Sequence, residues 1–332
     1  MSDYFRPLVQ QGAKRPSDAV TLAGGALWFT HAEHLRRDRP GRVIAAADIP
    51  PDQMERLTAG RAALAGLDMG QAHLMGILNV TPDSFSDGGR HFGIEAARRV
   101  ALEMVAQGVS LLDVGGESTR PGALEVPAED EIHRTAPVIE AIRAETGTAI
   151  SIDTRKASVA EAALAAGASL VNDVSGFTFD AALAPLCAET RTPVCIMHAQ
   201  GDPATMQQDP HYDDVLLDVY DFLAAQVDRL VARGMARGQI VIDPGIGFGK
   251  TQDHNLTLLR NLSLFHGIGC PILLGVSRKR FIGTIGKEPR AQARGPGSIS
   301  VGLAGLAQGV QILRVHDVAE TAQALRLWAA VR

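Results

Sequence analysis

The stretch His73-Leu-Met-Gly-Ile-Leu-Asn79 is an apolar run that ends in a polar side chain, and the same design recurs until Asp317. A strand buried on both faces of a parallel sheet is apolar along its whole length. Polar groups at the carboxyl ends of such strands meet at one mouth, where a (β/α)8 barrel places its active site. We therefore expect an α/β protein with a TIM-barrel fold. The eight runs end at Leu78-Asn79, Leu112-Asp113, Ile152-Asp153, Val171-Asn172-Asp173, Met197-His198, Ile242-Asp243, Gly275-Val276-Ser277 and Arg314-Val315-His316-Asp317.

Segments with helical spacing of apolar residues separate these runs. Ile94–Gln107 is followed by Gly108, and Asp213–Arg233 is followed by Gly234, as helices often end. Asp317-Val-Ala-Glu320 resembles a capping box that opens the last helix. Eight strand–helix repeats favour closure into a barrel, and a doubly wound open sheet is the alternative. Long connections, which are often lids or substrate walls, are expected over Asn79–Gly93, Gly115–Pro127, His198–Tyr212 and Ser277–Gly295.

The first 70 residues lack this regularity. We assign residues 1–70 to an N-terminal extension and residues 71–332 to the barrel. One or two short strands are expected within Ala19–His31, and one helix over Pro51–Leu67. Because the first barrel strand starts opposite the mouth, the extension should emerge at that opposite face. The residues expected to cover the barrel floor there are Leu27, Trp28 and Phe29.

Composition narrows the possible function classes. The chain has 332 residues, 46% of them hydrophobic, and a net charge of −5 without a basic tract, which argues against a nucleic-acid partner. No apolar run reaches the roughly 18 residues of a membrane span, and the N-terminus does not resemble a signal peptide. Three scattered cysteines show no metal-ligand spacing and suit reduced thiols, so we expect a cytoplasmic protein without a membrane partner.

The polar side chains at the mouth suggest two kinds of ligand. Carboxylates and amides suit a nitrogen-rich heterocycle, because Asp accepts two N–H bonds from an amino-pyrimidinone edge and Asn supplies donor and acceptor. Arg314 and His316 lie two residues apart on the last strand, where this fold usually binds phosphate. The positive charge of an arginine side chain and the planar, forked arrangement of its N–H donors suit a diphosphate. The other mouth residues are Asn79, Asp113, Asp153, Asn172, Asp173, His198, Asp243 and Lys279.

Some of these residues have a structural explanation that is equally open. Asp317 suits a helix cap, Asp173 a turn, and a lone His198 a core histidine. The segment Asp243–Thr251 resembles a nucleotide P-loop but is one residue short, so a tight turn near a flat ligand is favoured, with Phe248 as a wall. Nothing in the sequence identifies a His–Asp pair for a nucleophilic triad at Ser118.

At these positions the chain closely resembles the dihydropteroate synthase family of folate biosynthesis. The matching segments occur in the family's order and span residues 75–317, so residues 1–70 lie outside the resemblance. They are Gly76-Ile-Leu-Asn-Val-Thr-Pro-Asp-Ser-Phe-Ser-Asp-Gly-Gly89, Gly115-Gly-Glu-Ser-Thr-Arg-Pro-Gly122, Ile152-Asp-Thr154, Val171-Asn-Asp173, Asp243–Lys250, Ser277-Arg-Lys-Arg-Phe-Ile-Gly283 and Arg314-Val-His-Asp317.

The resemblance implies a reaction in which (7,8-dihydropterin-6-yl)methyl diphosphate and 4-aminobenzoate give 7,8-dihydropteroate and diphosphate. It implies that the catalytic residues are Asp153, Asp243, Lys279, Arg314 and His316. It adds to these, as substrate-binding residues, Thr119, Arg120, Pro121, Asn172, Met197, Phe248, Gly275 and Arg280. A Mg²⁺ cofactor on the diphosphate is implied at Asn79 and Asp87.

The resemblance also implies a homodimer. Two alternatives stay open: a pterin-binding methyltransferase that acts on methyltetrahydrofolate with a corrinoid partner, and a non-enzymatic pterin-binding paralogue. The methyltransferase would share the Asp and Asn residues at the pterin edge. It would not need Arg314 and His316 or the Thr119-Arg120-Pro121 segment.

Overall fold

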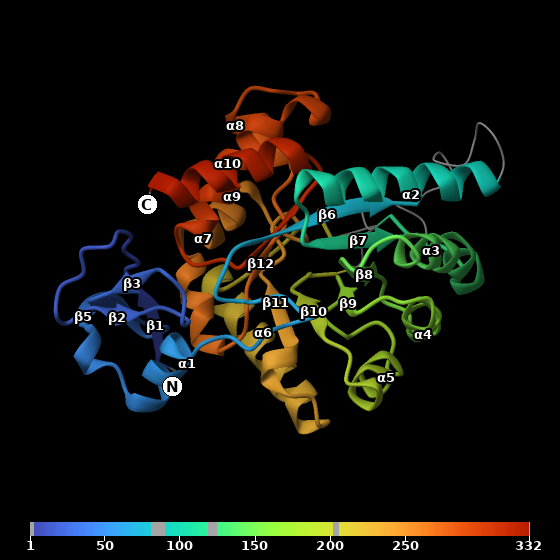
Figure 1. Cartoon of the computed structure of the whole chain (residues 1–332). Helices are drawn as coiled ribbons and strands as arrows, with labels where there is room; N and C mark the ends of the chain where they lie inside the picture. The colour runs from blue at the N-terminus through green and yellow to red at the C-terminus, as the bar shows by residue number, and fades with distance from the viewer. Residues whose placement is uncertain (1–2, 81–89, 119–124, 202–205, 332) are drawn as a thin grey trace.

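The computed structural model describes residues 3–80, 90–118, 125–201 and 206–331. Eight parallel strands form one sheet in the order β11-β10-β9-β8-β7-β6-β13-β12 (Figure 1). The sheet closes between β11 and β12, because the Ile242 N–H donates to the Pro271 carbonyl at 3.0 Å and Ile242 bridges Ile272. The predicted barrel is confirmed. Its strands are β6 His73–Asn79, β7 Leu111–Gly115, β8 Ala149–Asp153, β9 Leu170–Asp173, β10 Val194–Met197, β11 Ile240–Asp243, β12 Leu273–Leu274 and β13 Ile312–Val315.

Helices surround the barrel wall, and α6, within the segment Asp213–Arg233 expected to be helical, begins directly after Asp214. The Asp214 carboxylate accepts the N–H groups of Leu216 and Leu217 there. The structure adds two short helices to the expected alternation: the 3-10 helix η4, Leu262–Ile268, follows α7, and α8 lies within the connection expected over Ser277–Gly295. The helices are α2 Arg90–Gln107, α3 Ala128–Arg143, α4 Ala157–Ala165, α5 Leu183–Thr190, α6 Val215–Ala232, α7 Gln252–Arg260, α8 Arg280–Ile285, α9 Gly295–Leu306 and α10 Val318–Val331.

The N-terminal extension has its own small core. β1 Tyr4–Pro7, β4 His31–Arg36 and β5 Arg39–Ala45 form an antiparallel sheet, and β2 Val20–Thr21 pairs with β3 Trp28–Phe29 as expected within Ala19–His31. The extension, blue in Figure 1, contacts η4 through β1 and α1. The buried apolar side chains of this core are those of Phe5, Leu22, Ala23, Leu27, Phe29, Ala32, Ala46, Ile49 and Leu57.

The expectation of one helix over Pro51–Leu67 is wrong, because α1 spans only Pro51–Thr58. The Arg61 guanidinium donates to the Arg56 carbonyl at 2.9 Å and so satisfies a carbonyl that a longer helix would use. The chain then runs toward the amino ends of the barrel strands.

The barrel floor is closed by Leu64 and Met69, each 1% exposed, and not by the expected Leu27, Trp28 and Phe29. Leu27 and Phe29 belong to the extension's own core. Leu64 and Met69 pack against one interior residue from each strand, namely Met75, Leu111, Ala149, Leu170, Cys195, Val241, Leu273 and Ile312.

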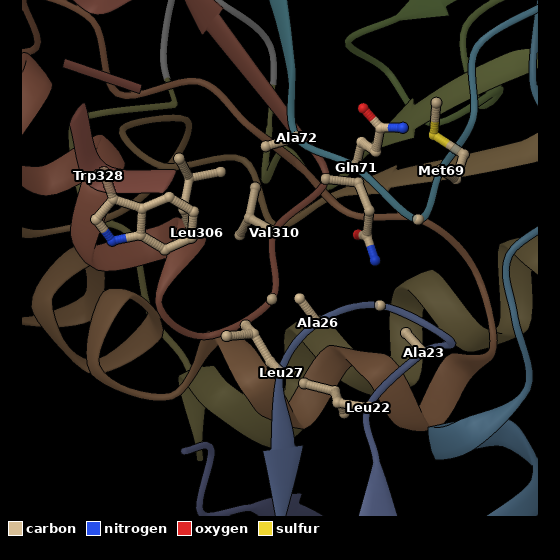
Figure 2. Close-up of a pocket in the computed structure, with 14 residues that line it drawn as sticks. Leu22, Ala23, Ala26, Leu27, Met69, Gln71, Ala72, Leu306, Val310 and Trp328 are labelled. Atoms are coloured by element: carbon tan, nitrogen blue, oxygen red, sulfur yellow. The ribbon is translucent and has the colours of Figure 1, made fainter. Parts of the chain in front are cut away.

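A small cavity of about 40 Å³ lies between the extension and the barrel, remote from the mouth. Figure 2 shows Leu22 and Leu27 of the extension facing Leu306, Val310 and Trp328 of the barrel. In the part of the chain that the structure describes, no helix combines the length and the apolar character needed to span a membrane.

Candidate active site

Acidic side chains from different strands converge at the carboxyl end of the barrel and meet one arginine. Arg314 on β13 donates from Nε to Asp113 Oδ2 at 2.6 Å and from Nη2 to Asp153 Oδ2 at 2.7 Å. Asn172 on β9 donates to the Asp113 carboxylate at 3.3 Å. Asp113, Asp153 and Asn172 are almost fully buried. The barrel thus brings together groups that lie on four strands and up to 201 positions apart.

Burial makes the two predicted pterin-binding carboxylates hard to ionise. It raises the pKa of Asp153 to about 7, against the lowering effect of Arg314. Burial also raises the pKa of Asp243, while Lys279 lowers it. Among the described residues, nothing donates a hydrogen bond to Oδ1 of Asp153. This buried oxygen can therefore accept an N–H from a ligand.

The turn after β11 supplies a wall beside Asp243. The Asp243 carboxylate accepts the Gly245 N–H at 2.8 Å. The Lys279 ammonium lies 4.5 Å from the centre of the Phe248 ring and donates to the Ile246 carbonyl. Burial lowers the pKa of Lys279 to about 8, although Asp243 opposes the effect. Phe248 and Lys279 therefore form one face next to a buried carboxylate.

The P-loop alternative for Asp243–Thr251 does not fit the structure. The Lys250 side chain is buried, and its ammonium donates to the carbonyls of Gly245 at 2.9 Å and Phe248 at 3.0 Å. It also lies 2.8 Å from Nδ1 of His198. Burial, together with Lys250, lowers the pKa of His198 to about 2, so this histidine stays neutral and is structural. Lys250 holds the turn and cannot reach a phosphate.

The turn after β11 requires glycine at position 245. The φ of Gly245 is +69°, and a Cβ there would lie 1.8 Å from the carbonyl oxygen of His198. Met197, at the end of β10, packs against the same turn and is 4% exposed. Gly275 follows β12, and a Cβ there would lie 3.7 Å from Asp243 Oδ2. Met197 and Gly275, both predicted to bind substrate, thus border Asp243.

Unlike Arg314, which contacts buried carboxylates, His316 and Asn79 of the predicted diphosphate site lie at the ends of their strands. Nδ1 of His316 is 2.9 Å from Ser277 Oγ, which also accepts the His316 N–H at 3.1 Å. Asn79 is exposed at the end of β6, and Arg280 is exposed at the start of α8. The remaining predicted site residues lie outside the described residues; they are Asp87, Thr119, Arg120 and Pro121.

Of the two residues predicted to hold Mg²⁺, Asn79 and Asp87, the structure describes Asn79. No group of three or more His, Cys, Asp or Glu side chains within the described ranges is placed to hold a metal ion. Mg²⁺ usually binds through one or two protein oxygens together with substrate phosphates and water. The exposed Asn79 amide at the mouth fits that mode, whereas Asp113 and Asp153 are engaged by Arg314.

Two features of the site do not follow from the sequence. The first is the pairing of Asp113 with Arg314 and Asn172, since the sequence places Asp113 at the mouth without indicating a partner. The second is a buried cluster of Glu117, Glu131 and Lys156 beside β7 and β8. Glu117 lies within a glycine-rich segment, but only the fold shows its partners. The alternative for Asp173 is confirmed, since its carboxylate accepts the N–H groups of Ser175 and Phe177 at 2.7 Å and holds the turn after β9.

Comparison with known proteins agrees with this geometry. A family model described as "Pterin binding enzyme" matches residues 75–316. A dihydropteroate synthase of Escherichia coli (strain K12) is 45% identical over 264 residues, which cover 79% of this chain and 92% of that protein. A dihydropteroate synthase of Synechocystis is 45% identical over 253 residues, which cover 76% of this chain and 88% of that protein.

Solved structures give the same result. A Yersinia pestis dihydropteroate synthase in complex with a sulfonamide drug superposes with a TM-score of 0.76 at 43% identity, covering 80% of this chain and 96% of that chain. A Xanthomonas albilineans dihydropteroate synthase with 4-aminobenzoic acid gives 0.75 at 43% identity, with the same two coverages. The chain belongs to the dihydropteroate synthase family of pterin-binding enzymes.

Proposed function

We propose that the chain condenses (7,8-dihydropterin-6-yl)methyl diphosphate with 4-aminobenzoate and releases 7,8-dihydropteroate and diphosphate. One observation supports this assignment above the others: the carboxylates of Asp153 and Asp243 are buried at the mouth, and the Phe248–Lys279 face lies beside Asp243. Asp153 offers a buried acceptor oxygen that no described group occupies. A flat heterocycle with N–H donors along one edge satisfies both carboxylates.

In this proposal the residues of the chain act mainly by electrostatics. The bond between the methylene carbon and the diphosphate oxygen breaks, and its electron pair leaves with the diphosphate. Arg314 and His316 stabilise the departing charge. Asp153 and Asp243 stabilise the positive charge that spreads over the pterin, and Asn172 and Met197 border the ring. The aryl amine then forms the new C–N bond and loses a proton.

We propose that Mg²⁺ assists departure of the diphosphate. Asn79 and Asp87 would hold the ion with oxygens of the substrate, and when bound it neutralises charge on the leaving group. Removal of metal with EDTA should weaken diphosphate binding measured by calorimetry, while binding of a pterin without phosphates stays unchanged. Metal-independent diphosphate binding would contradict this assignment.

The second substrate is proposed to lie along Phe248, Lys279 and Gly275. The resemblance adds Thr119, Arg120 and Pro121, which lie outside the described residues, to the residues proposed to bind it. Arg280 borders the slot at the start of α8. The relative from Yersinia pestis was solved with a sulfonamide drug. We therefore expect 4-aminobenzenesulfonamide compounds to compete with 4-aminobenzoate here. Inhibition that excess 4-aminobenzoate does not relieve would exclude a shared slot.

A turnover assay separates this function from the alternatives. The purified chain should release one diphosphate for each dihydropteroate formed, and only when both substrates are present. A methyltransferase would instead consume methyltetrahydrofolate with a corrinoid, and a binding paralogue would release nothing. The matched relatives are named dihydropteroate synthases, which favours the first outcome.

We also propose a cytoplasmic homodimer. Cys187, Cys195 and Cys270 are free thiols buried in the core, which suits a reducing compartment. On α10, Leu327 is 62% and Val331 82% exposed, and a second copy of the chain would cover such apolar side chains. Light scattering of the wild type and of Leu327→Glu tests this, because a dimer formed through α10 should dissociate in the variant.

A further inference from the structure

The connection after β12 contains an arginine whose backbone is left-handed. Arg278 has a φ of +59°, a region that residues other than glycine seldom adopt. It lies between two residues of the site. Ser277 Oγ is 2.9 Å from Nδ1 of His316, and the Lys279 ammonium is 4.5 Å from the centre of the Phe248 ring. The backbone conformation of Arg278 therefore sets the directions of the side chains on both sides of it.

The main chain of Arg278 is held from the start of α9. Its N–H donates to Ser298 Oγ at 2.8 Å, and its carbonyl accepts from Nη1 of Arg294 at 3.0 Å. Ser298 Oγ in turn donates to the Arg294 carbonyl at 2.8 Å, so the two contacts form one unit. The Arg278 guanidinium also donates to Asp317, just before α10, at 3.1 Å. A left-handed residue persists only where its surroundings fix it, and here the contacts fix both of its main-chain polar groups.

The guanidinium of Arg294 also binds the far end of the same connection. Its Nε donates to the Glu288 carbonyl at 2.9 Å, and its Nη2 donates to the Pro289 carbonyl at 2.6 Å. One planar side chain thus joins the chain before α8 to the chain after it, which the single ammonium of a lysine could not do. Gly283 in α8 leaves room for this contact, because a Cβ there would lie 2.5 Å from Nε of Arg294.

We propose that Arg294 is a positioning residue for the active site, which acts by fixing the left-handed backbone of Arg278. Through that backbone it directs the Ser277 hydroxyl toward His316 and the Lys279 ammonium toward the wall beside Asp243. The inference rests on the proposed function, because that function assigns Lys279 and His316 to the substrates. An arginine that only stabilised the connection would leave the surroundings of Lys279 unchanged, and this difference supplies the test.

Titration of Lys279 by NMR tests its placement without turnover. In the wild type, burial lowers the pKa of Lys279 to about 8, Asp243 opposes this effect, and Arg314 adds to it. In full-length Arg294→Met the released ammonium should become hydrated, so its pKa should rise to about 9 or above, toward the ordinary value of about 10.4. The measurement follows the Cε signal of ¹³C-labelled lysine between pH 6 and pH 11, and the signal is assigned by its absence in Lys279→Met.

Two further variants separate this role from a general loss of structure. Arg290→Met is the matched control, because Arg290 lies in the same connection but is 76% exposed and contacts the Glu288 carboxylate at 3.1 Å. The control should titrate and turn over as the wild type does. Gly283→Ala keeps Arg294 but displaces its guanidinium, and alanine suits a helix better than glycine. This variant should therefore fold and should raise the pKa of Lys279 as Arg294→Met does.

The kinetics of the same proteins complete the test. Arg294→Met and Gly283→Ala should each lower kcat/KM about tenfold or more, since displacements near 1 Å can cost about 100-fold in rate. A wild-type Lys279 titration in both variants, or an unchanged kcat/KM, would overturn the positioning role. If Arg294→Met fails to fold, Gly283→Ala decides alone. A raised Lys279 pKa in a protein whose wild type forms no dihydropteroate would support the placement and refute the proposed function instead.

Discussion

Replacing Arg314 by Met tests whether its guanidinium sets the charge of the carboxylate proposed to bind the pterin. In the wild type the pKa of Asp153 is about 7, so about half of the protein has an ionised Asp153 at pH 7. A neighbouring Arg lowers the pKa of an Asp by about 1–3, so its loss should raise that of Asp153 to roughly 8 or above. The ionised fraction at pH 7 then falls to about a tenth or less, and pterin affinity should fall at least about fivefold.

Calorimetric titration with 6-hydroxymethyl-7,8-dihydropterin from pH 6 to pH 9 measures this effect. Affinity of the Arg314→Met variant should recover as the pH rises, because Asp153 ionises again. The wild type, titrated in parallel, corrects for other groups, above all Lys279, whose pKa is about 8. Pterin affinity equal to that of the wild type at pH 7 would refute the reasoning and would leave Arg314 with the diphosphate alone.

Three further predictions concern the carboxylates, the pH profile and the barrel floor. Asp153→Asn and Asp243→Asn should each lower kcat/KM about 100-fold or more with an unchanged circular dichroism spectrum, because the amide loses the charge that stabilises the cation; near-normal kinetics in both would exclude the site. The value of kcat/KM should fall below about pH 7, where Asp153 gains a proton, and above about pH 8, where Lys279 loses one. In Lys279→Met the decrease at high pH should be absent, and a decrease that persists would have to come from another group. A chain that starts at residue 70 lacks the buried Leu64 and Met69, whereas a chain that starts at residue 60 keeps them. The shorter chain should have unchanged KM values, but its free energy of unfolding should be lower by about 3–6 kcal/mol. Equal urea denaturation midpoints for the two chains would mean that the floor is closed in another way.

The barrel and its mouth could be predicted because each strand carries its own signal. An apolar run followed at once by Asp153 or Asp243 places a carboxylate at the mouth whatever the rest of the chain does. The pairing of Arg314 with Asp113 could not be read in this way. Those residues are 201 positions apart, and only the closed barrel brings them together.

The extension was harder to predict because its strands are short or mostly exposed. In β5, Arg39–Ala45, the first five residues are exposed, so no alternation of buried and exposed residues marks the strand. The segment Pro51–Leu67 has helical spacing throughout, yet the helix ends at Thr58. The tertiary contact of Leu64 with the barrel floor, which no local pattern encodes, requires the chain to leave the helix.

The most direct test of the central claim is a crystal structure of the protein with 6-hydroxymethyl-7,8-dihydropterin bound. We expect the ring at the carboxyl end of the barrel, with its N–H donors on Oδ1 of Asp153 and on the Asp243 carboxylate and one face toward Lys279. A pterin bound elsewhere, or one at the mouth that touches neither carboxylate, would contradict the proposed site.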